Sequence, residues 1–304
     1  MSLDKEVAEY LSREEGIDPA FIEKDWHAVR VLQALSHHSH EGITTIFTGG
    51  TSLSKGYGLL KRFSEDLDFR AQIDGTLSAN KLRKLKSAFR KGVINALREI
   101  EDLSFEEDDI VVDGLGFKIQ LTYPKKFESP HGIRPELQIE FSYTQPRLNT
   151  EHRPIASMIA RYAGNPDETG FLCLSPVEIA ADKFSSLTWR VHKRNREDEK
   201  DDPAMLRHLH DLCELRGMID ADNALFISTT LESFATDQQR LNRQVGMALK
   251  DAALTASTIL QRDALYEEEY QQFVDAMSYA PEDERVDFAQ AVDNFQKLAN
   301  LLDA

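Results

Sequence analysis

The sequence predicts an α/β (α+β) fold, in which a small mixed β-sheet with flanking helices is followed by a helical C-terminal domain. Runs typical of β-strands, either β-branched or alternating between apolar and polar residues, occur only before residue 175. From Asn223 to Leu302 the pattern is helical with short breaks. We therefore divide the chain into a first domain of residues 1–174 and a helical domain of residues 175–304.

The first domain combines helical segments with short strands. Apolar residues at helical spacing predict N-terminal helical structure over residues 4–38, and a basic amphipathic pattern predicts a helix over residues 77–100. Strands are predicted at residues 42–47, 66–70, 116–123, 135–143 and 171–174. The strand at 66–70 alternates acidic with apolar residues, which indicates that one of its faces is exposed to water.

The second domain opens with a strong helix-start signal. Ser175 is placed as the N-cap, Pro176 as the first helical residue and Glu178 as the third, and this helix is expected to run to about Arg190. Residues 195–202 are highly charged, and we expect them to be mobile. Residues 203–216 are again helical, and Gly217 is expected to end that helix.

Composition limits the class of protein. With 304 residues, 41% of them hydrophobic, and only two cysteines, the chain is expected to be globular rather than a disulfide-stapled secreted fold. The start of the chain lacks the apolar core of a signal peptide, and no apolar run approaches the about 20 residues of a membrane helix. We expect a cytoplasmic protein without a membrane partner.

The net charge of −16 argues against a general nucleic-acid coat protein but allows a local basic groove. Two segments reverse the acidic trend, Lys81–Lys91 and Arg190–Arg196. Each is either a solvated helix face or a surface that contacts phosphates.

The main chemical signal is a pair of glycines followed by a pair of aspartates. Gly49 and Gly50 precede Asp66 and Asp68, and Asp66 lies 16 residues after Gly50. Residues i and i+2 of a strand point the same way, so both carboxylates can converge on one metal ion or on two. Mg²⁺ takes such carboxylates on one side and keeps waters and phosphates on the other. The pattern favours attack on the α-phosphate of an NTP.

Neighbouring residues complete the predicted site. Glycine lets the backbone approach a phosphate closely, and the hydroxyl of Thr51 or Ser52 is a candidate ligand. Lys55 either reaches a phosphate or is an ordinary surface lysine. Glu140, in an apolar–acid–apolar setting on a later strand, is the candidate third acid. The glycines are not a Walker A loop, because no Gly-Lys-Ser/Thr follows them.

The motif resembles the signature of a known family. Residues 49–55 (GGTSLSK) and 62–69 (RFSEDLDF) resemble the nucleotidyltransferase AbiEii/AbiGii toxin family. Three further segments fit, namely 22–26 (IEKDW), 175–183 (SPVEIAADK) with Arg190, and 207–212 (RHLHDL). The resemblance spans Ile22 to Leu215. His208 and His210 depart from residues that are common in the family.

The resemblance implies a nucleotidyltransferase-like fold and a toxin from a toxin–antitoxin or phage-abortive-infection pair. It implies NTP as substrate, Mg²⁺ or Mn²⁺ at Asp66 and Asp68, an RNA acceptor with tRNA the leading candidate, and an AbiEi-like antitoxin as partner.

Three residues of the helical domain are expected to join this site. Lys183 and Arg190 are seven residues apart, share one helix face and either grip the triphosphate or are surface cations. Asp211 either pairs with Arg207 within its own helix, orients Lys183 or Arg190, or contacts the nucleotide.

Two other functions stay open from the sequence. The first is a transferase of the same fold with a protein or small-molecule acceptor. The second is a catalytically silent nucleotide-binding protein, against which the intact Asp66 and Asp68 argue. Only the identity of the labelled acceptor separates an RNA transferase from the first alternative.

Overall fold

The computed structural model describes residues 3–128, 134, 136–165, 167–199 and 201–303. The chain forms two compact units. The first contains residues 1–58 and 63–174, and the second contains residues 59–62 and 175–304. The chain therefore changes unit after Leu174 and also around the short segment Leu59–Arg62.

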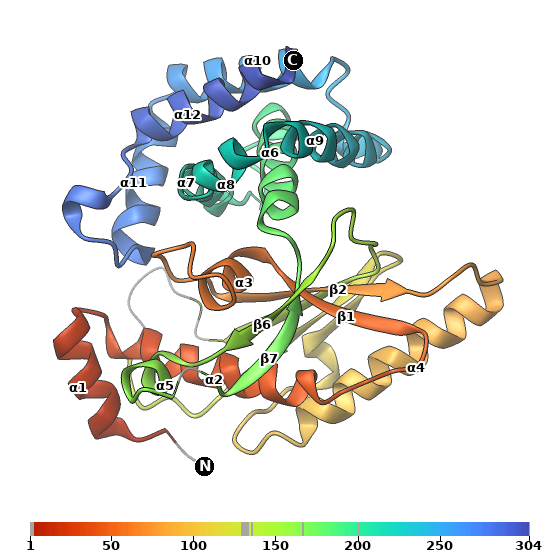
Figure 1. Cartoon of the computed structure of the whole chain (residues 1–304), viewed down its shortest axis with the longest axis vertical. Coiled ribbons are helices and arrows are strands. Elements are labelled where there is room, and N and C mark those ends of the chain that lie inside the picture. The colour runs from red at the N-terminus through yellow and green to blue at the C-terminus, as the bar shows by residue number, and fades with distance from the viewer. Residues whose placement is uncertain (1–2, 129–133, 135, 166, 200, 304) are drawn as a thin grey trace. The chain divides into compact units, whose positions relative to one another are not determined.

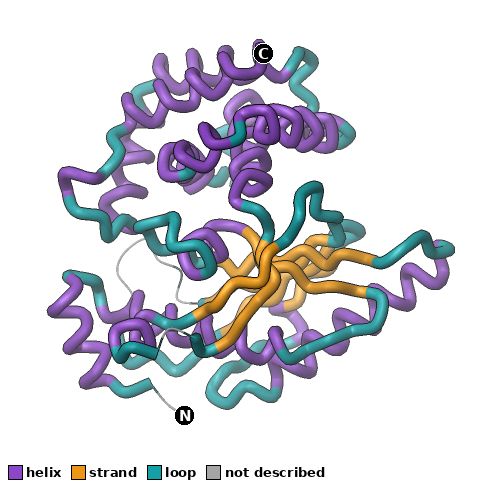
Figure 2. The backbone as a smooth tube through the Cα atoms, in the orientation of Figure 1, coloured by secondary structure: helices purple, strands orange, loops and turns teal. Residues whose placement is uncertain are grey.

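The first unit is built on a mixed seven-stranded sheet (Figures 1 and 2). The strand order is β3-β4-β5-β2-β1-β7-β6, with β2–β5 and β1–β7 parallel and the other pairs antiparallel. The strands are β1 (Ile43–Thr48), β2 (Asp66–Ile73), β3 (Ile110–Val112), β4 (Gly116–Leu121), β5 (Leu137–Ser142), β6 (Glu151–Ile155) and β7 (Thr169–Cys173). Strands β3 and β6 were not predicted. They are the two edge strands, and β6 carries Pro154, which an edge tolerates.

One face of the sheet forms the core of this unit. Alternate residues of the central strands are buried there, including Phe69 of β2, Phe117 of β4 and Phe141 of β5. The three rings stack in a row, with centroids 4.8 Å apart for Phe69–Phe141 and 4.7 Å for Phe117–Phe141. Helices α2 (Pro19–Ser36) and α4 (Ala79–Arg98) supply apolar residues to the same core (Figure 1).

The remaining helices of this unit are α1 (Lys5–Glu15), α3 (Gly49–Lys55), α5 (Met158–Tyr162) and a short 3₁₀ turn, η1 (Glu107–Asp109). The helical structure expected over residues 4–38 is present and is divided into the two helices α1 and α2. Gly16 ends α1 in the left-handed conformation with φ of 67°, and Asp18 then caps α2, which has proline at its first position.

The second unit is helical, apart from the short segment Leu59–Arg62. Its helices are α6 (Pro176–Lys193), α7 (Arg207–Glu214), α8 (Arg216–Ala221), α9 (Asn223–Gln238), α10 (Leu249–Arg262), α11 (Leu265–Met277) and α12 (Phe288–Asn300). Short 3₁₀ helices connect them, namely η2 (Pro203–Leu206), η3 (Leu241–Arg243), η4 (Glu282–Glu284) and η5 (Leu301–Asp303). The predicted arrangement, a mixed sheet with flanking helices followed by a helical region, is confirmed.

One local prediction for this unit is wrong. Gly217 does not end a helix, because it lies inside α8, and the chain bends two residues earlier, at Leu215. The predicted start of α6 is confirmed, with Ser175 as the N-cap and Pro176 as the first residue, although the Ser175 side chain makes no capping hydrogen bond in the described part of the chain. No helix among the described residues is both long enough and apolar enough to cross a membrane.

Candidate active site

The two aspartates of the motif lie side by side on the polar face of the sheet. Asp66 and Asp68 begin β2, while Leu67 between them points into the core. In the strand register, Asp68 is opposite Thr48 of β1 and Glu140 of β5. The structure thus brings Glu140 to the strand next to Asp68, where it also forms an ion pair with Lys118 at 2.6 Å.

Gly49 presses the backbone of the glycine motif against Asp68. It begins α3 with φ of 76°, and a Cβ atom added there would lie 2.2 Å from Oδ2 of Asp68. Both the backbone conformation and the contact therefore require glycine. Gly50, the next residue, is buried within α3.

The hydroxyl groups of the motif brace the loop. The Thr51 hydroxyl donates to the backbone carbonyl of Asp66 at 2.6 Å, and the Ser52 hydroxyl donates to the carbonyl of Gly49 at 3.2 Å. Both side chains are buried. The hydroxyls thus fix the start of α3 against the strand that carries the aspartates.

Lys55 is not a surface lysine. It is buried at the end of α3, where it forms an ion pair with Asp25 of α2 and donates to the carbonyl of Ala156 at 3.4 Å. Asp25 also accepts a hydrogen bond from the backbone N–H of Met158 at 2.8 Å. Lys55 therefore links α3 to α2 and to the backbone at Ala156. Its proposed contact with a phosphate would require the Lys55–Asp25 ion pair to open.

A cationic group that the sequence analysis missed already contacts the aspartate pair. The Arg134 guanidinium donates to Oδ1 of Asp66 at 3.0 Å. Its backbone is held by a buried ion pair, because its N–H donates to Glu65 at 2.7 Å and its carbonyl accepts from Lys24 at 2.7 Å. Lys24 and Glu65 are 2.9 Å apart. Both belong to the segments quoted for the family resemblance, but nothing in the sequence indicated a link to Arg134.

The donor set suits a hard divalent cation that shares its coordination with a substrate. Two carboxylates at i and i+2 match the number that proteins usually offer to Mg²⁺ bound with phosphates. Among the described residues, no three His, Cys, Asp or Glu side chains converge as a metal-binding group. The close contact of the Gly49 backbone with Asp68 brings the glycine motif next to the carboxylates, so phosphate oxygens held there would be beside an ion bound by Asp66 and Asp68.

The helical unit contains a second charged cluster, formed by Arg62, Lys183 and Asp211. The Nε and Nη2 groups of Arg62 donate to the two oxygens of Asp211, each at 2.6 Å, and Lys183 lies 2.7 Å from Oδ2. Burial alone would raise the pKa of Asp211, but the charges of Arg62 and Lys183 hold that pKa well below its ordinary value. The expectation that Asp211 orients Lys183 is consistent with this geometry.

Burial lowers the pKa of the Lys183 ammonium, against the opposing charge of Asp211, and the Arg62 charge lowers that pKa further. The other residues of this unit that were predicted from the sequence behave differently. Arg190 lies on the same helix as Lys183, but its guanidinium pairs with Asp202 at 2.7 Å.

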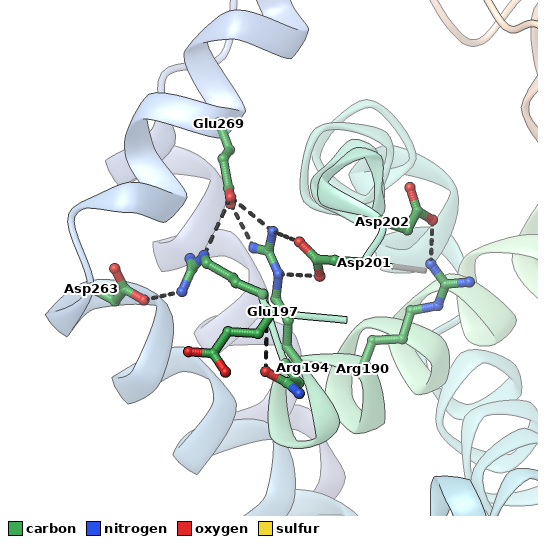
Figure 3. Close-up of polar contacts among 9 residues, drawn as sticks. Arg190, Arg194, Glu197, Asp201, Asp202, Asp263 and Glu269 are labelled. Carbon is green, nitrogen blue, oxygen red and sulfur yellow. Dashed lines mark hydrogen bonds and ion pairs between the residues drawn. The ribbon is translucent and has the colours of Figure 1, made fainter. Parts of the chain in front are cut away.

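Described residues in and beside the charged stretch 195–202 form ion pairs with other parts of the helical unit (Figure 3). Arg194 bridges Asp201 and Glu269, with distances of 2.8 Å and 2.6 Å. Arg196 pairs with Asp263 at 2.5 Å and with Glu269 at 3.4 Å. Because these cations already neutralise carboxylates, the segment Arg190–Arg196 does not present the open basic surface that the sequence suggested.

The basic segment Lys81–Lys91 lies on α4. This helix buries Phe89, Val93 and Leu97 in the core, so it covers the apolar face of the sheet, the face opposite Asp66 and Asp68. Its cations are exposed or half-buried on the outer side of the helix. Within this unit, the basic surface and the aspartate pair thus lie on opposite faces of the sheet.

Together, a mixed sheet, a glycine motif packed on a strand and two aspartates on that strand define a nucleotidyltransferase fold. The comparison with protein families agrees, because residues 30–294 match the family described as nucleotidyl transferase AbiEii toxin, type IV TA system. The chain belongs to this family. It is a nucleotidyltransferase toxin of a type IV toxin–antitoxin system.

Among solved structures, the chain is similar to MenT4, a nucleotidyltransferase toxin from Mycobacterium tuberculosis. The TM-score is 0.63 with 17% identity, over 99% of this chain and 90% of that one, which supports the shared fold. Two others match with low TM-scores, and we draw nothing from them. The c-UMP-AMP synthase CdnE of Rhodothermus marinus has a TM-score of 0.27 and 10% identity, covering 98% of this chain and 96% of that one. CdnC of E. coli has 0.30 and 14%, covering 98% and 89%. No curated protein matches the sequence significantly.

Proposed function

We propose that the protein transfers a nucleotide from an NTP to an RNA acceptor, with tRNA the leading candidate, and that it does so with Mg²⁺ or Mn²⁺ bound by Asp66 and Asp68. The observation that carries this proposal is the aspartate pair on the polar face of β2, with the backbone of Gly49 packed against Asp68. A divalent ion there would neutralise phosphate charge and lower the pKa of an attacking hydroxyl.

In the proposed reaction, an RNA hydroxyl oxygen attacks the α-phosphorus of the NTP. The new P–O bond forms as the bond to pyrophosphate breaks, and the hydroxyl proton leaves to a base. Glu140 is the proposed group near Asp68 that receives the proton or completes the metal site. The backbone at Gly49 and Gly50 would lie against the phosphates, where only glycine allows so close an approach.

The helical unit is proposed to bind the triphosphate through Lys183, which Asp211 holds in place. Arg190 remains a weaker candidate for the same task, since its guanidinium is paired with Asp202. A lysine held by a fixed carboxylate is a suitable partner for a phosphate, because the ammonium keeps further N–H donors.

The family implies an antitoxin partner, and we propose an AbiEi-like protein acting in the cytoplasm, as part of phage defence by abortive infection. A cytoplasmic location agrees with the substrates, because both NTPs and tRNA are found there.

The decisive experiment incubates the protein with each labelled NTP in turn, with Mg²⁺ or Mn²⁺ and total RNA. We expect label in an RNA band of tRNA size with one or a few of the four NTPs. Label in protein alone, or in a small molecule, would replace the RNA acceptor by one of those classes. If no NTP labels any acceptor with either metal, the proposed transfer is wrong.

A cellular experiment tests the toxin role independently. Expression without a partner is expected to stop bacterial growth, and the Asp68→Ala variant, expressed at the same level, is expected to relieve the arrest. Growth that is equally normal with both proteins would contradict a toxic transferase activity.

A further inference from the structure

Arg134 combines a fixed backbone with a half-exposed side chain. A buried ion pair holds the backbone from both sides: its N–H donates to Glu65 at 2.7 Å, and its carbonyl accepts from Lys24 at 2.7 Å. The side chains of Lys24 and Glu65 are 8% and 10% exposed, whereas that of Arg134 is 45% exposed. The guanidinium can therefore change partners while the residue itself stays beside the aspartates.

The Arg134 guanidinium lies where two parallel strands of the sheet begin. Its Nη2 donates to Oδ1 of Asp66, the first residue of β2, at 3.0 Å. Its Nη1 donates to Oε1 of Gln138 at 2.8 Å, and Gln138 is opposite Asp66 in the register of β2 with β5. Its Nε lies 3.7 Å from Glu65. All of these residues belong to the first unit, which also contains Asp68 and the glycine motif.

Stability alone does not explain this arrangement. A half-exposed ion pair such as Arg134–Asp66 contributes little to the unfolding free energy, and the attraction within a buried pair such as Lys24–Glu65 offsets its desolvation only in part. The two pairs together hold a forked cation at the carboxylate that begins β2. A guanidinium presents parallel N–H donors that match carboxylates and phosphates alike, so the same group can bind either.

A divalent ion at Asp66 and Asp68 would change which anion this guanidinium prefers. The ion adds two positive charges beside Arg134, so the attraction between Arg134 and Asp66 falls. The phosphates that accompany such an ion offer anionic oxygens in the same place. Exchange of the Asp66 carboxylate for a phosphate oxygen relieves the repulsion between the two cations and retains a charge-assisted hydrogen bond.

We propose that Arg134 is a further substrate-binding residue: it gives up Asp66 to the metal ion and donates instead to a phosphate of the NTP. This inference rests on the proposed function, because it takes the metal ion and the NTP from it. It predicts effects of opposite sign. Removing the guanidinium should strengthen metal binding at the aspartates and weaken binding of the substrate's phosphates, whereas removing a merely structural arginine would weaken both.

The test uses Arg134→Gln, with Arg98→Gln as a matched control, in the full chain. Arg98 is also a half-exposed arginine of the first unit in an ion pair, since it lies 3.0 Å from Glu107 and its side chain is 50% exposed. Mn²⁺ binding is measured by electron paramagnetic resonance without nucleotide. Binding of inorganic tripolyphosphate and of each NTP is measured by calorimetry at saturating Mn²⁺. Asp66→Ala identifies the Mn²⁺ binding that belongs to the aspartates.

Arg134→Gln is expected to tighten Mn²⁺ binding by about two- to fivefold, the size of one partly exposed ion pair. Its affinity for tripolyphosphate, and for the NTP that binds best, should fall by about 10-fold or more, the size of one lost charge-assisted hydrogen bond. Binding of the matching nucleoside, which has no phosphate, should change little. Arg98→Gln should bind every ligand like wild type.

Arg134→Gln is expected to fold, because the backbone contacts with Lys24 and Glu65 remain, and circular dichroism checks this. Arg134→Lys keeps the charge but loses the fork. It should therefore bind Mn²⁺ like wild type, with an affinity for tripolyphosphate between those of wild type and Arg134→Gln. If Arg134→Gln does not fold, wild-type affinity of Arg134→Lys for tripolyphosphate would overturn the inference.

The inference also fails if folded Arg134→Gln binds tripolyphosphate as tightly as wild type, or if it loses Mn²⁺ and tripolyphosphate binding together. Weaker labelling of RNA with unchanged NTP affinity would likewise overturn it, because Arg134 would then serve the acceptor. Failure of the proposed function gives a different result, in which the wild-type protein itself binds neither Mn²⁺ at the aspartates nor an NTP.

Discussion

Asp66 of β2 and Asp211 of the helical unit both form ion pairs, but the cations that contact them differ in their exposure to water. Asp66 is contacted by Arg134, whose side chain is 45% exposed, and it lies at the start of a strand on the polar face of the sheet. Asp211 is fully buried and shared by two buried cations. Although Asp66 is buried like Asp211, its cation is half-exposed and can give way to a metal ion, whereas Asp211 is held by two buried cations and is a fixed structural anchor.

The largest expected effect is on chemistry at the exchangeable pair. Asp66→Ala and Asp68→Ala should each reduce transfer by about 10³-fold or more, since a metal ion contributes several kcal/mol to such reactions. The fold should persist, because both side chains lie on the polar face of the sheet and outside the apolar core, although Asp66 itself is buried. Transfer rates in labelled NTP assays, with melting temperature as the control, check this. A folded Asp66→Ala protein that transfers at the wild-type rate would remove the assigned site.

Substitution of the buried Asp211 should reduce the unfolding free energy far more than substitution of Asp66. Asp211→Asn leaves Arg62 and Lys183 without their counter-charge, and breaking such a buried pair costs about 3 to 5 kcal/mol of unfolding free energy. Asp66→Asn should cost much less. Urea denaturation of both variants measures the difference, and equal losses would show that the two environments are not distinct.

The dependence of stability on acidic pH should reveal the special environment of Asp211. The pKa of Asp211 is held below its unfolded value, so its contribution to stability is complete above the unfolded pKa of about 3.9 and is lost only as pH falls through the lower folded pKa. The slope of unfolding free energy against pH in that acidic range should decrease in Asp211→Asn. An unchanged slope would mean that Asp211 is not ionised in the folded protein.

The sequence predicted much of the aspartate region and little of the Asp211 region, for a physical reason. Strand periodicity and a glycine pair are local signals, so Asp66, Asp68 and the adjacent Glu140 follow from spacing along the chain. The partners of Asp211 are not local. Arg62 lies 149 residues away, whereas the nearby candidate, Arg207, was the natural choice from i,i+4 spacing.

Charge patterns were the least reliable signal, because the sequence shows charges but not their partners. Arg194 and Arg196 looked like a phosphate-binding surface until the structure placed Glu269 of α11 between them. Lys55 looked exposed, yet it is buried against Asp25. In both cases a distant carboxylate decides the role, and no periodicity reports it.

Substitution of Gly49 separates two effects on transfer activity, namely the close approach of the backbone to Asp68 and backbone strain. Gly49→Ala adds a Cβ atom 2.2 Å from the Asp68 carboxylate and also strains a backbone with φ of 76°. Gly58→Ala is the matched control, because Gly58 has φ of 66° but open space around its Cβ position. Both should lose about 1 to 2 kcal/mol from strain. Only Gly49→Ala should also lose transfer, by about 10²-fold. Equal activities would place the phosphates elsewhere.

The smallest expected effect concerns the basic helix α4. Its cations were predicted as one of two RNA-contacting tracks, but α4 covers the face of the sheet opposite Asp66 and Asp68. Reversing the charges at Lys84, Lys86 and Arg90 should therefore change use of the NTP hardly at all. RNA contacts release counterions, so any loss of RNA labelling should grow from low to moderate salt. We expect a loss of no more than about threefold at moderate salt, since only distant phosphates of a long acceptor reach that face.

A loss of 100-fold would show that the acceptor wraps around the sheet and that α4 is a main binding surface. Identical labelling at every salt concentration would show that α4 is only a solvated face, and the RNA track would then have to be sought on the polar side of the sheet, beginning with Arg134 and Lys118.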